Sequence, residues 1–138
     1  MSELTKAHEG TPLPRPTPLS RPFWDGCNEG ELRVQRCEDC GTHVFIPNFV
    51  CTSCFSESLE WVVSSGKGTV YSWTVVHRPQ RPSFRCPYAV AIVELEEGYY
   101  MLSNLLDVDP EAVAVGMPVE VEFVKSSDDI TLPYFKPV

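Results

Sequence analysis

The chain has 138 residues, 43% of them hydrophobic, and a formal net charge of −8 at pH 7. This length suits one globular domain or two small ones. The negative charge argues against a general nucleic-acid-binding protein, because phosphate contacts need clustered lysine and arginine side chains. No apolar run approaches the roughly 18 residues of a membrane-spanning helix, so no membrane association is expected.

The N-terminal region, residues 1–20, is rich in proline and polar residues and lacks the apolar stretch of a secretory signal. We therefore expect a cytoplasmic protein, whose clustered cysteines are metal ligands rather than disulfides. Alternating prolines from Pro12 to Pro18 predict an extended arm. The arm is either disordered or lies along a partner subunit.

A short helix is predicted to follow the arm. Ser20 is expected to cap it, with Pro22 in its first turn. Phe23, Trp24 and Cys27 would line one face of this helix. Because so short a helix is unstable alone, that face must pack against the rest of the protein.

Two Cys-x-x-Cys pairs separated by ten residues follow, and they contain Cys37, Cys40, Cys51 and Cys54. Four thiolates at such spacing are typical of a tetrahedral structural zinc site with no open coordination position. Strands expected at 31–35, 42–49 and 59–63 surround the pairs. Residues 21–63 are thus predicted to form the helix and a rubredoxin-like zinc ribbon binding one Zn²⁺; iron is the alternative metal.

From residue 64 the pattern changes to β-strands, expected at 68–77, 88–96, 99–106, 119–123 and 130–136. One short helix is expected between the third and fourth strands, at about 109–116. Five strands with a helix at this point have the element order of an OB-fold barrel. The predicted fold is therefore mainly β, with the barrel at 64–138.

This order of elements, together with several short motifs, resembles the stand-alone zinc-ribbon/OB-fold proteins associated with acyl-CoA metabolism. The similarity covers about residues 20–138. The matching motifs are Pro22-Phe23-Trp24, Cys37-x-x-Cys40-Gly41, Cys51-x-x-Cys54, Gly66-x-Gly68-x-Val70-x-Ser72, Thr74-Val75-Val76-His77, Pro87-Tyr88, Leu102-Ser103-Asn104, Gly116-Met117-Pro118-Val119 and Leu132-Pro133.

The resemblance implies a non-catalytic subunit of a hetero-oligomer with a thiolase-fold enzyme, such as benzoylsuccinyl-CoA thiolase or a steroid side-chain aldolase or thiolase. Some members of the family partner with hydratases instead. The OB-fold is expected to hold the CoA part of a thioester substrate or to bridge subunits. The ribbon and the helix are expected to dock the partner, with Phe23 and Trp24 as the docking residues.

One segment of the chain has a charge distribution that agrees with a CoA contact. No acidic residue occurs between Glu60 and Glu94, and Arg78, Arg81 and Arg85 lie in this segment, between the first two barrel strands. Arginines pair well with phosphates, and aromatic rings such as those of Trp73 and Phe84 stack on adenine. A solvated loop, or one facing an acidic partner, is the alternative.

The chain lacks the nucleophile elbow, HExxH helix, P-loop and dinucleotide glycine pattern of common enzyme sites. Cys86 lies near His77 in sequence, but a Cys–His catalytic pair is not expected. Two other functions remain as alternatives. One is a single-stranded nucleic-acid-binding protein that stacks bases on strand aromatics, and the other is a subunit of an enoyl-CoA hydratase complex.

Overall fold

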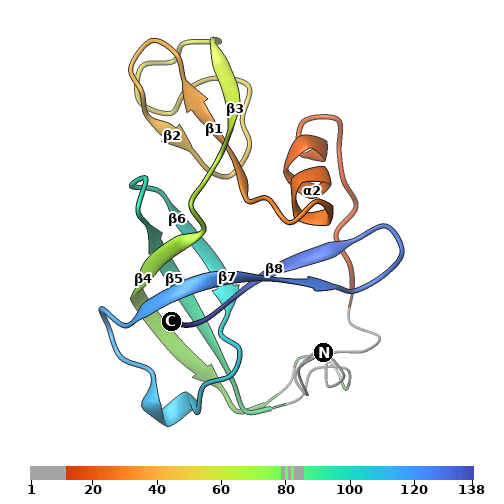
Figure 1. Ribbon diagram of the computed structural model, residues 1–138, viewed down its shortest axis with the longest axis vertical. Helices are drawn as coiled ribbons and strands as arrows, with labels where there is room; N and C mark the ends of the chain where they lie inside the picture. The colour runs from red at the N-terminus through yellow and green to blue at the C-terminus, as the bar shows by residue number, and fades with distance from the viewer. Residues whose placement is uncertain (1–11, 79, 81, 83–85) are drawn as a thin grey trace.

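A three-stranded sheet stands at one end of a five-stranded barrel, and the α-helix of the described residues lies beside the junction (Figure 1). The computed structural model describes residues 12–78, 80, 82 and 86–138. No helix in this described part is long and apolar enough to cross a membrane. The predicted mainly β fold, with one helix, a ribbon and a barrel, is confirmed. The predicted boundaries at residues 20 and 63 stay predictions.

The helix α2 (Arg21–Asn28) begins with Pro22 in its first turn, as predicted. The predicted cap is wrong, because the Ser20 side chain makes no hydrogen bond to the helix. Instead, Ser20 Oγ accepts hydrogen bonds from the backbone N–H of Thr17 at 2.9 Å and from its hydroxyl at 3.1 Å. The hydroxyl therefore stabilises the turn that ends the proline-rich arm, not the helix that follows.

In the ribbon, β1 (Arg33–Cys37) lies between β2 (His43–Val44) and β3 (Leu59–Val63), and both pairings are antiparallel. The strand expected at 42–49 is thus only two residues long. Beyond it, the buried amide of Gln35 replaces strand pairing: it accepts from the Asn48 N–H at 2.7 Å and donates to the Asn48 carbonyl at 3.0 Å. Pro47, which lacks an N–H, suits this departure from the sheet.

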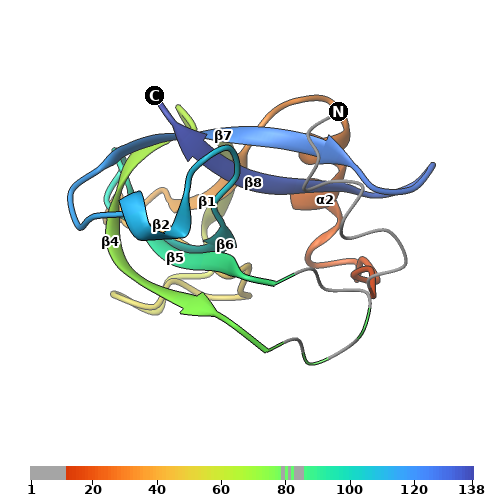
Figure 2. The same ribbon diagram turned by 90° about the horizontal axis from the view of Figure 1, so that it is seen from below.

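The barrel has the strand order β6-β5-β4-β7-β8, and Figure 2 shows β4 and β5 on one side of it with β7 and β8 on the other. A parallel bridge between Leu105 and Phe135 nearly closes it. The predicted short helix is a 3₁₀ turn, η1 (Pro110–Ala112), which ends early because the chain becomes extended at Val113 and buries that side chain. The strands are β4 (Lys67–Val76), β5 (Tyr88–Leu95), β6 (Tyr100–Asn104), β7 (Pro118–Lys125) and β8 (Thr131–Pro137).

The helix and the ribbon share a hydrophobic core with the barrel. Phe23, Cys27 and Val34 belong to the same buried cluster as Val93 and Phe135. Burial raises the pKa of the Cys27 thiol to about 12, as expected for a cysteine that packs as a small hydrophobic side chain. The helix and the base of the ribbon therefore pack into the core of the barrel.

A second connection between ribbon and barrel is made by Glu97, in the turn between β5 and β6. Its carboxylate accepts hydrogen bonds from the Ser65 N–H at 2.6 Å and the Ser64 hydroxyl at 2.9 Å. Both serines lie in the short segment that leaves β3. Next in this segment, Gly66 has φ of +73°, and a Cβ there would lie 2.5 Å from a methyl group of Val121. The connection between ribbon and barrel thus depends on both the Glu97 carboxylate and Gly66.

We predict that Glu97→Ala lowers the free energy of unfolding by about 1.5–3 kcal/mol, the typical contribution of hydrogen bonds to a charged group. Urea denaturation followed by tryptophan fluorescence measures the change. Glu96→Ala is the matched control, because the neighbouring Glu96 is exposed. Equal stability of the two variants would contradict a connecting role for Glu97.

Candidate metal centre and apolar groove

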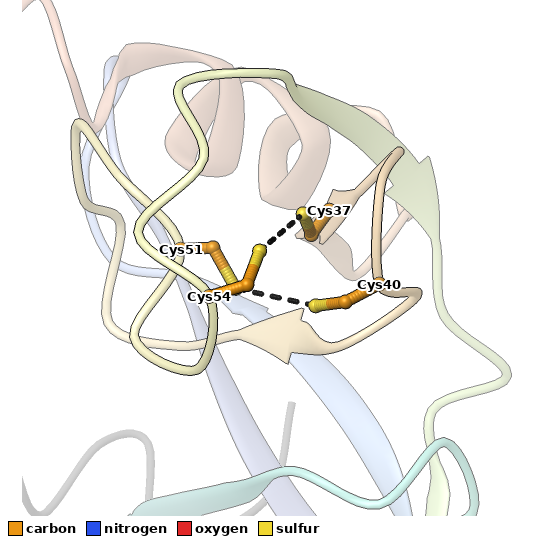
Figure 3. Close-up of side chains that lie close together, drawn as sticks. All are labelled: Cys37, Cys40, Cys51 and Cys54. Carbon is orange, nitrogen blue, oxygen red and sulfur yellow. Dashed lines mark hydrogen bonds between the residues drawn. The ribbon is translucent and has the colours of Figure 1, made fainter.

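The four cysteines converge at the tip of the ribbon, and Figure 3 shows their side chains pointing toward one another. Their sulfur atoms all lie within 4.8 Å of each other. The Sγ atoms of Cys37 and Cys54 are 3.6 Å apart, as are those of Cys40 and Cys51. Zn–S bonds of about 2.3 Å in a tetrahedron place the sulfurs about 3.8 Å apart, so the cluster fits one zinc ion.

The two cysteine pairs form turns of the same backbone conformation. The N–H of Gly41 donates to the Cys37 carbonyl at 2.9 Å, and the N–H of Phe55 donates to the Cys51 carbonyl at 3.0 Å. Both donors adopt left-handed backbone, with φ of +78° at Gly41 and +63° at Phe55. Glycine suits this conformation, whereas phenylalanine rarely adopts it. The sequence therefore signals the first turn but not the second.

Burial and hydrogen bonding differ among the four cysteines. Cys37 and Cys51 are buried, whereas Cys40 and Cys54 lie on the exposed side. Thr42 Oγ1 lies 3.2 Å from Cys40 Sγ, and hydrogen bonds with Thr42 lower the pKa of the Cys40 thiol to about 6. The pKa of the Cys54 thiol is raised to about 12 beside the sulfur atoms of Cys40 and Cys37. The thiolate is the form that binds metal. With four protein ligands, a zinc ion here would have no position for water or substrate, and its role would be structural.

A groove of about 650 Å³ lies between α2, the segment 45–47 and the strands β5, β6 and β8. Fifteen of the described residues line it and none of these is charged, although the chain as a whole carries −8. They are Ser20, Phe23, Trp24, Phe45, Ile46, Pro47, Ile92, Tyr100, Met101, Leu102, Ser103, Asn104, Leu132, Pro133 and Tyr134.

The predicted docking residues meet at this groove. Phe23 is only 5% exposed and packs edge-on against Trp24, with ring centroids 4.9 Å apart. Trp24 is half-buried and reaches the groove surface. The sequence analysis did not identify Ile46 and Leu102 as groove residues, although they are more exposed, with 74% and 68% of their surface accessible. The apolar residues at the outward positions of β6, Tyr100 and Leu102, could have indicated a binding surface, because the solvent-facing side of a sheet is normally polar.

The predicted CoA-binding residues are only partly described. Trp73 lies on β4 with 36% of its surface exposed, and Arg78 follows that strand on the surface. Arg81, Phe84 and Arg85 lie outside the described residues. The CoA contact therefore stays a prediction.

We predict that the purified protein is colourless and contains one zinc per chain. Cys51→Ala should abolish metal binding and unfold the ribbon, because the three remaining cysteines cannot complete a tetrahedral site. Elemental analysis and circular dichroism measure the two effects. Cys86→Ala is the control and should retain the zinc, since Cys86 lies outside the cluster. A red protein containing iron would contradict the zinc assignment.

Comparison with known proteins identifies both parts of the chain. Residues 24–60 match the family model described as the ChsH2 rubredoxin-like zinc ribbon domain, and residues 61–124 match the ChsH2 C-terminal OB-fold domain. A solved chain described as "Ltp2-ChsH2(DUF35) aldolase" superimposes with a TM-score of 0.83 at 34% identity. The match covers 91% of this chain and 98% of the solved one.

Relatives of known sequence carry different names. A DUF35 domain-containing scaffold protein of Pyrococcus furiosus is 42% identical over 111 residues, which cover 78% of this chain and 79% of the relative. The benzoylsuccinyl-CoA thiolase subunit BbsA of Geobacter metallireducens is 35% identical over 74 residues, 54% of this chain and 49% of that subunit.

Longer relatives also contain this unit. The 3-oxo-4,17-pregnadiene-20-carboxyl-CoA hydratase alpha subunit of Mycobacterium tuberculosis is 43% identical over 106 residues, 77% of this chain. The match spans only 34% of that subunit, and 36% of a probable enoyl-CoA hydratase alpha subunit of Thermomonospora curvata. The chain belongs to the DUF35 family, with a ChsH2-type zinc ribbon followed by an OB-fold domain.

Proposed function

We propose that this chain is a non-catalytic subunit of an acyl-CoA thiolase or aldolase complex. In this role it docks a thiolase-fold partner and helps to position the CoA thioester. The observation that carries the proposal is the similarity to the aldolase chain over nearly the full length of both proteins. The name of the BbsA relative, a thiolase subunit, supports the same class of partner.

The chemistry of the described residues supports a binding role. The four-cysteine cluster has the ligand set of a closed structural site. The groove presents uncharged and largely apolar side chains, as the centre of a protein interface does. We assign partner docking to this groove, with Trp24 at its surface and Phe23 supporting Trp24 from the core.

We assign the CoA contact to the end of β4 and the loop beyond it. Trp73 and Arg78 are both exposed there, and Arg81, Phe84 and Arg85 follow in the sequence. Phosphate pairing by the arginines and stacking by the aromatic rings would hold the nucleotide end of CoA. The thioester end would then extend toward the partner's active site.

A second candidate is a subunit of an enoyl-CoA hydratase complex. The names of the two longer relatives support it, since each contains a region at least 38% identical to this chain. These relatives have about three times the matched length, so their activity need not belong to the matched region. The identity of the partner separates the candidates: a thiolase-fold protein supports the first, and a hydratase subunit supports the second.

We predict that the chain alone does not turn over acyl-CoA, and that adding it to its purified thiolase-fold partner raises thiolysis or aldol cleavage at least about tenfold. In the complex, Arg78→Ala should raise KM for the CoA thioester about threefold to tenfold with little change in kcat, because it removes uniform binding. Steady-state kinetics measure both effects.

Lys125→Ala serves as the control for the loss of one exposed positive charge. Lys125 is the last residue of β7 and is not part of the assigned CoA contact. A rise in KM of the same size in this variant would contradict the assigned CoA contact. Full activity of the partner without this chain would contradict the proposed function itself.

A further inference from the structure

The barrel has an open seam between β6 and β8, and the apolar groove lies along it. On one edge β6 pairs with β5 over its whole length. On the other edge, within the described part of the chain, its strand pairing with β8 is limited to the bridge of Leu105 to Phe135, just past its end. The first residues of β6 therefore have a free edge.

The register shows which backbone groups lie on this free edge. The N–H of Leu95 donates to the Tyr99 carbonyl at 2.9 Å, and the N–H of Leu105 donates to the Ala89 carbonyl at 3.0 Å. Hydrogen-bonded pairs alternate along an antiparallel ladder, so the odd-numbered residues of β6 bond to β5. The N–H and C=O groups of Tyr100 and Leu102 must then point away from β5, toward the groove.

A third hydrogen bond supports this assignment. Leu106, which has the same parity as Tyr100 and Leu102, donates its N–H across the seam to the Phe135 carbonyl at 2.7 Å. Among the described residues, neither Tyr100 nor Leu102 is paired with a strand on this edge. Four backbone groups thus face the groove at the point where β8 has separated from β6.

The sequence of β8 explains why the seam stays open. Pro133 lies opposite β6 and has no N–H to donate. Its carbonyl accepts a hydrogen bond from the Ser103 hydroxyl at 2.7 Å instead of from the β6 backbone. A side chain therefore spans the seam, and β8 cannot complete the pairing of β6.

The chemistry of the seam selects the class of occupant. The free N–H and C=O groups suit another peptide backbone, because a strand added to a sheet edge satisfies donors and acceptors together. The side chains beside the edge are apolar and exposed, with Ile46 at 74%, Leu102 at 68% and Tyr100 at 46%. Since none of the lining residues that the structure describes is charged, an uncharged and apolar segment is the best match.

We propose that an extended, uncharged segment of the partner subunit adds to the free edge of β6 as a further strand. Alternate side chains of this segment would pack into the groove against Trp24 and Leu102. The inference rests on the proposed function, since it describes how the partner docks. It goes further in naming the backbone groups of Tyr100 and Leu102 as the contact.

Residue-resolved hydrogen exchange on the purified complex tests the proposal. The amides of Tyr100 and Leu102 should exchange at least about tenfold more slowly in the complex than in the free chain, because both gain acceptors. The amides of Met101 and Ser103 already bond to β5 and serve as internal controls. They should change much less.

A matched pair of variants tests the same surface. Leu102→Lys places a charge in the groove and should weaken the complex at least about tenfold, since a lysine on an edge strand opposes strand addition. Val115→Lys is the control, because Val115 is similarly exposed, at 70%, but does not line the groove. Isothermal titration with the partner gives Kd, and circular dichroism checks that both variants fold.

The outcomes separate the two proposals. A complex that forms without protection of Tyr100 and Leu102 overturns the strand addition and leaves the proposed function intact. Failure to form any complex with a thiolase-fold partner overturns both. Concentration-dependent protection of the same amides in the chain alone would assign the edge to a second copy of this chain, and would also overturn the inference.

Discussion

Convergence of four thiolates on one metal ion is the constraint on which the ribbon depends. The tip of the ribbon has a small cluster of its own, in which Cys37 and Cys51 pack with Val44. Two of these three side chains are metal ligands, so apolar packing contributes little. Zinc binding by such sites contributes on the order of 10–16 kcal/mol, which becomes folding free energy. The segment after β2 leaves this cluster and carries Phe45 and Ile46 to the groove. The metal therefore also holds one wall of the groove.

The other walls are fixed because the ribbon and the barrel share one core. Phe23 packs against Trp24 and Phe45, which belong to the helix and the ribbon, and it lies in the same cluster as Phe135 of the barrel. Glu97 ties the connecting segment to the β5–β6 turn. A surface built on such supports loses little conformational freedom when a partner binds. The groove is thus preorganised by interactions that lie outside it.

Local signals in the sequence predict the elements well. Cysteine spacing predicts the metal cluster, and runs of strand-forming residues separated by turn residues predict the five barrel strands. The errors arise where another side-chain contact competes with the expected one. Ser20 bonds to Thr17 rather than to the helix, and Gln35 takes the place of a strand partner for Asn48. The free edge of β6 is likewise invisible in the sequence, because it depends on where β8 diverges, some thirty residues later.

The two surfaces assigned to function are joined across the sheet. Tyr71 on β4 packs edge-on against Tyr100 on β6, with ring centroids 5.1 Å apart. Tyr100 lines the groove, and Tyr71 lies on the strand that leads to Trp73 and Arg78. Because both rings are exposed, a partner seated along β6 would also approach the face of β4. Under the proposed function, this arrangement brings the docked enzyme and the nucleotide end of CoA to one face of a single small barrel. The uncharged groove and the basic loop then act on one complex and not on two separate partners.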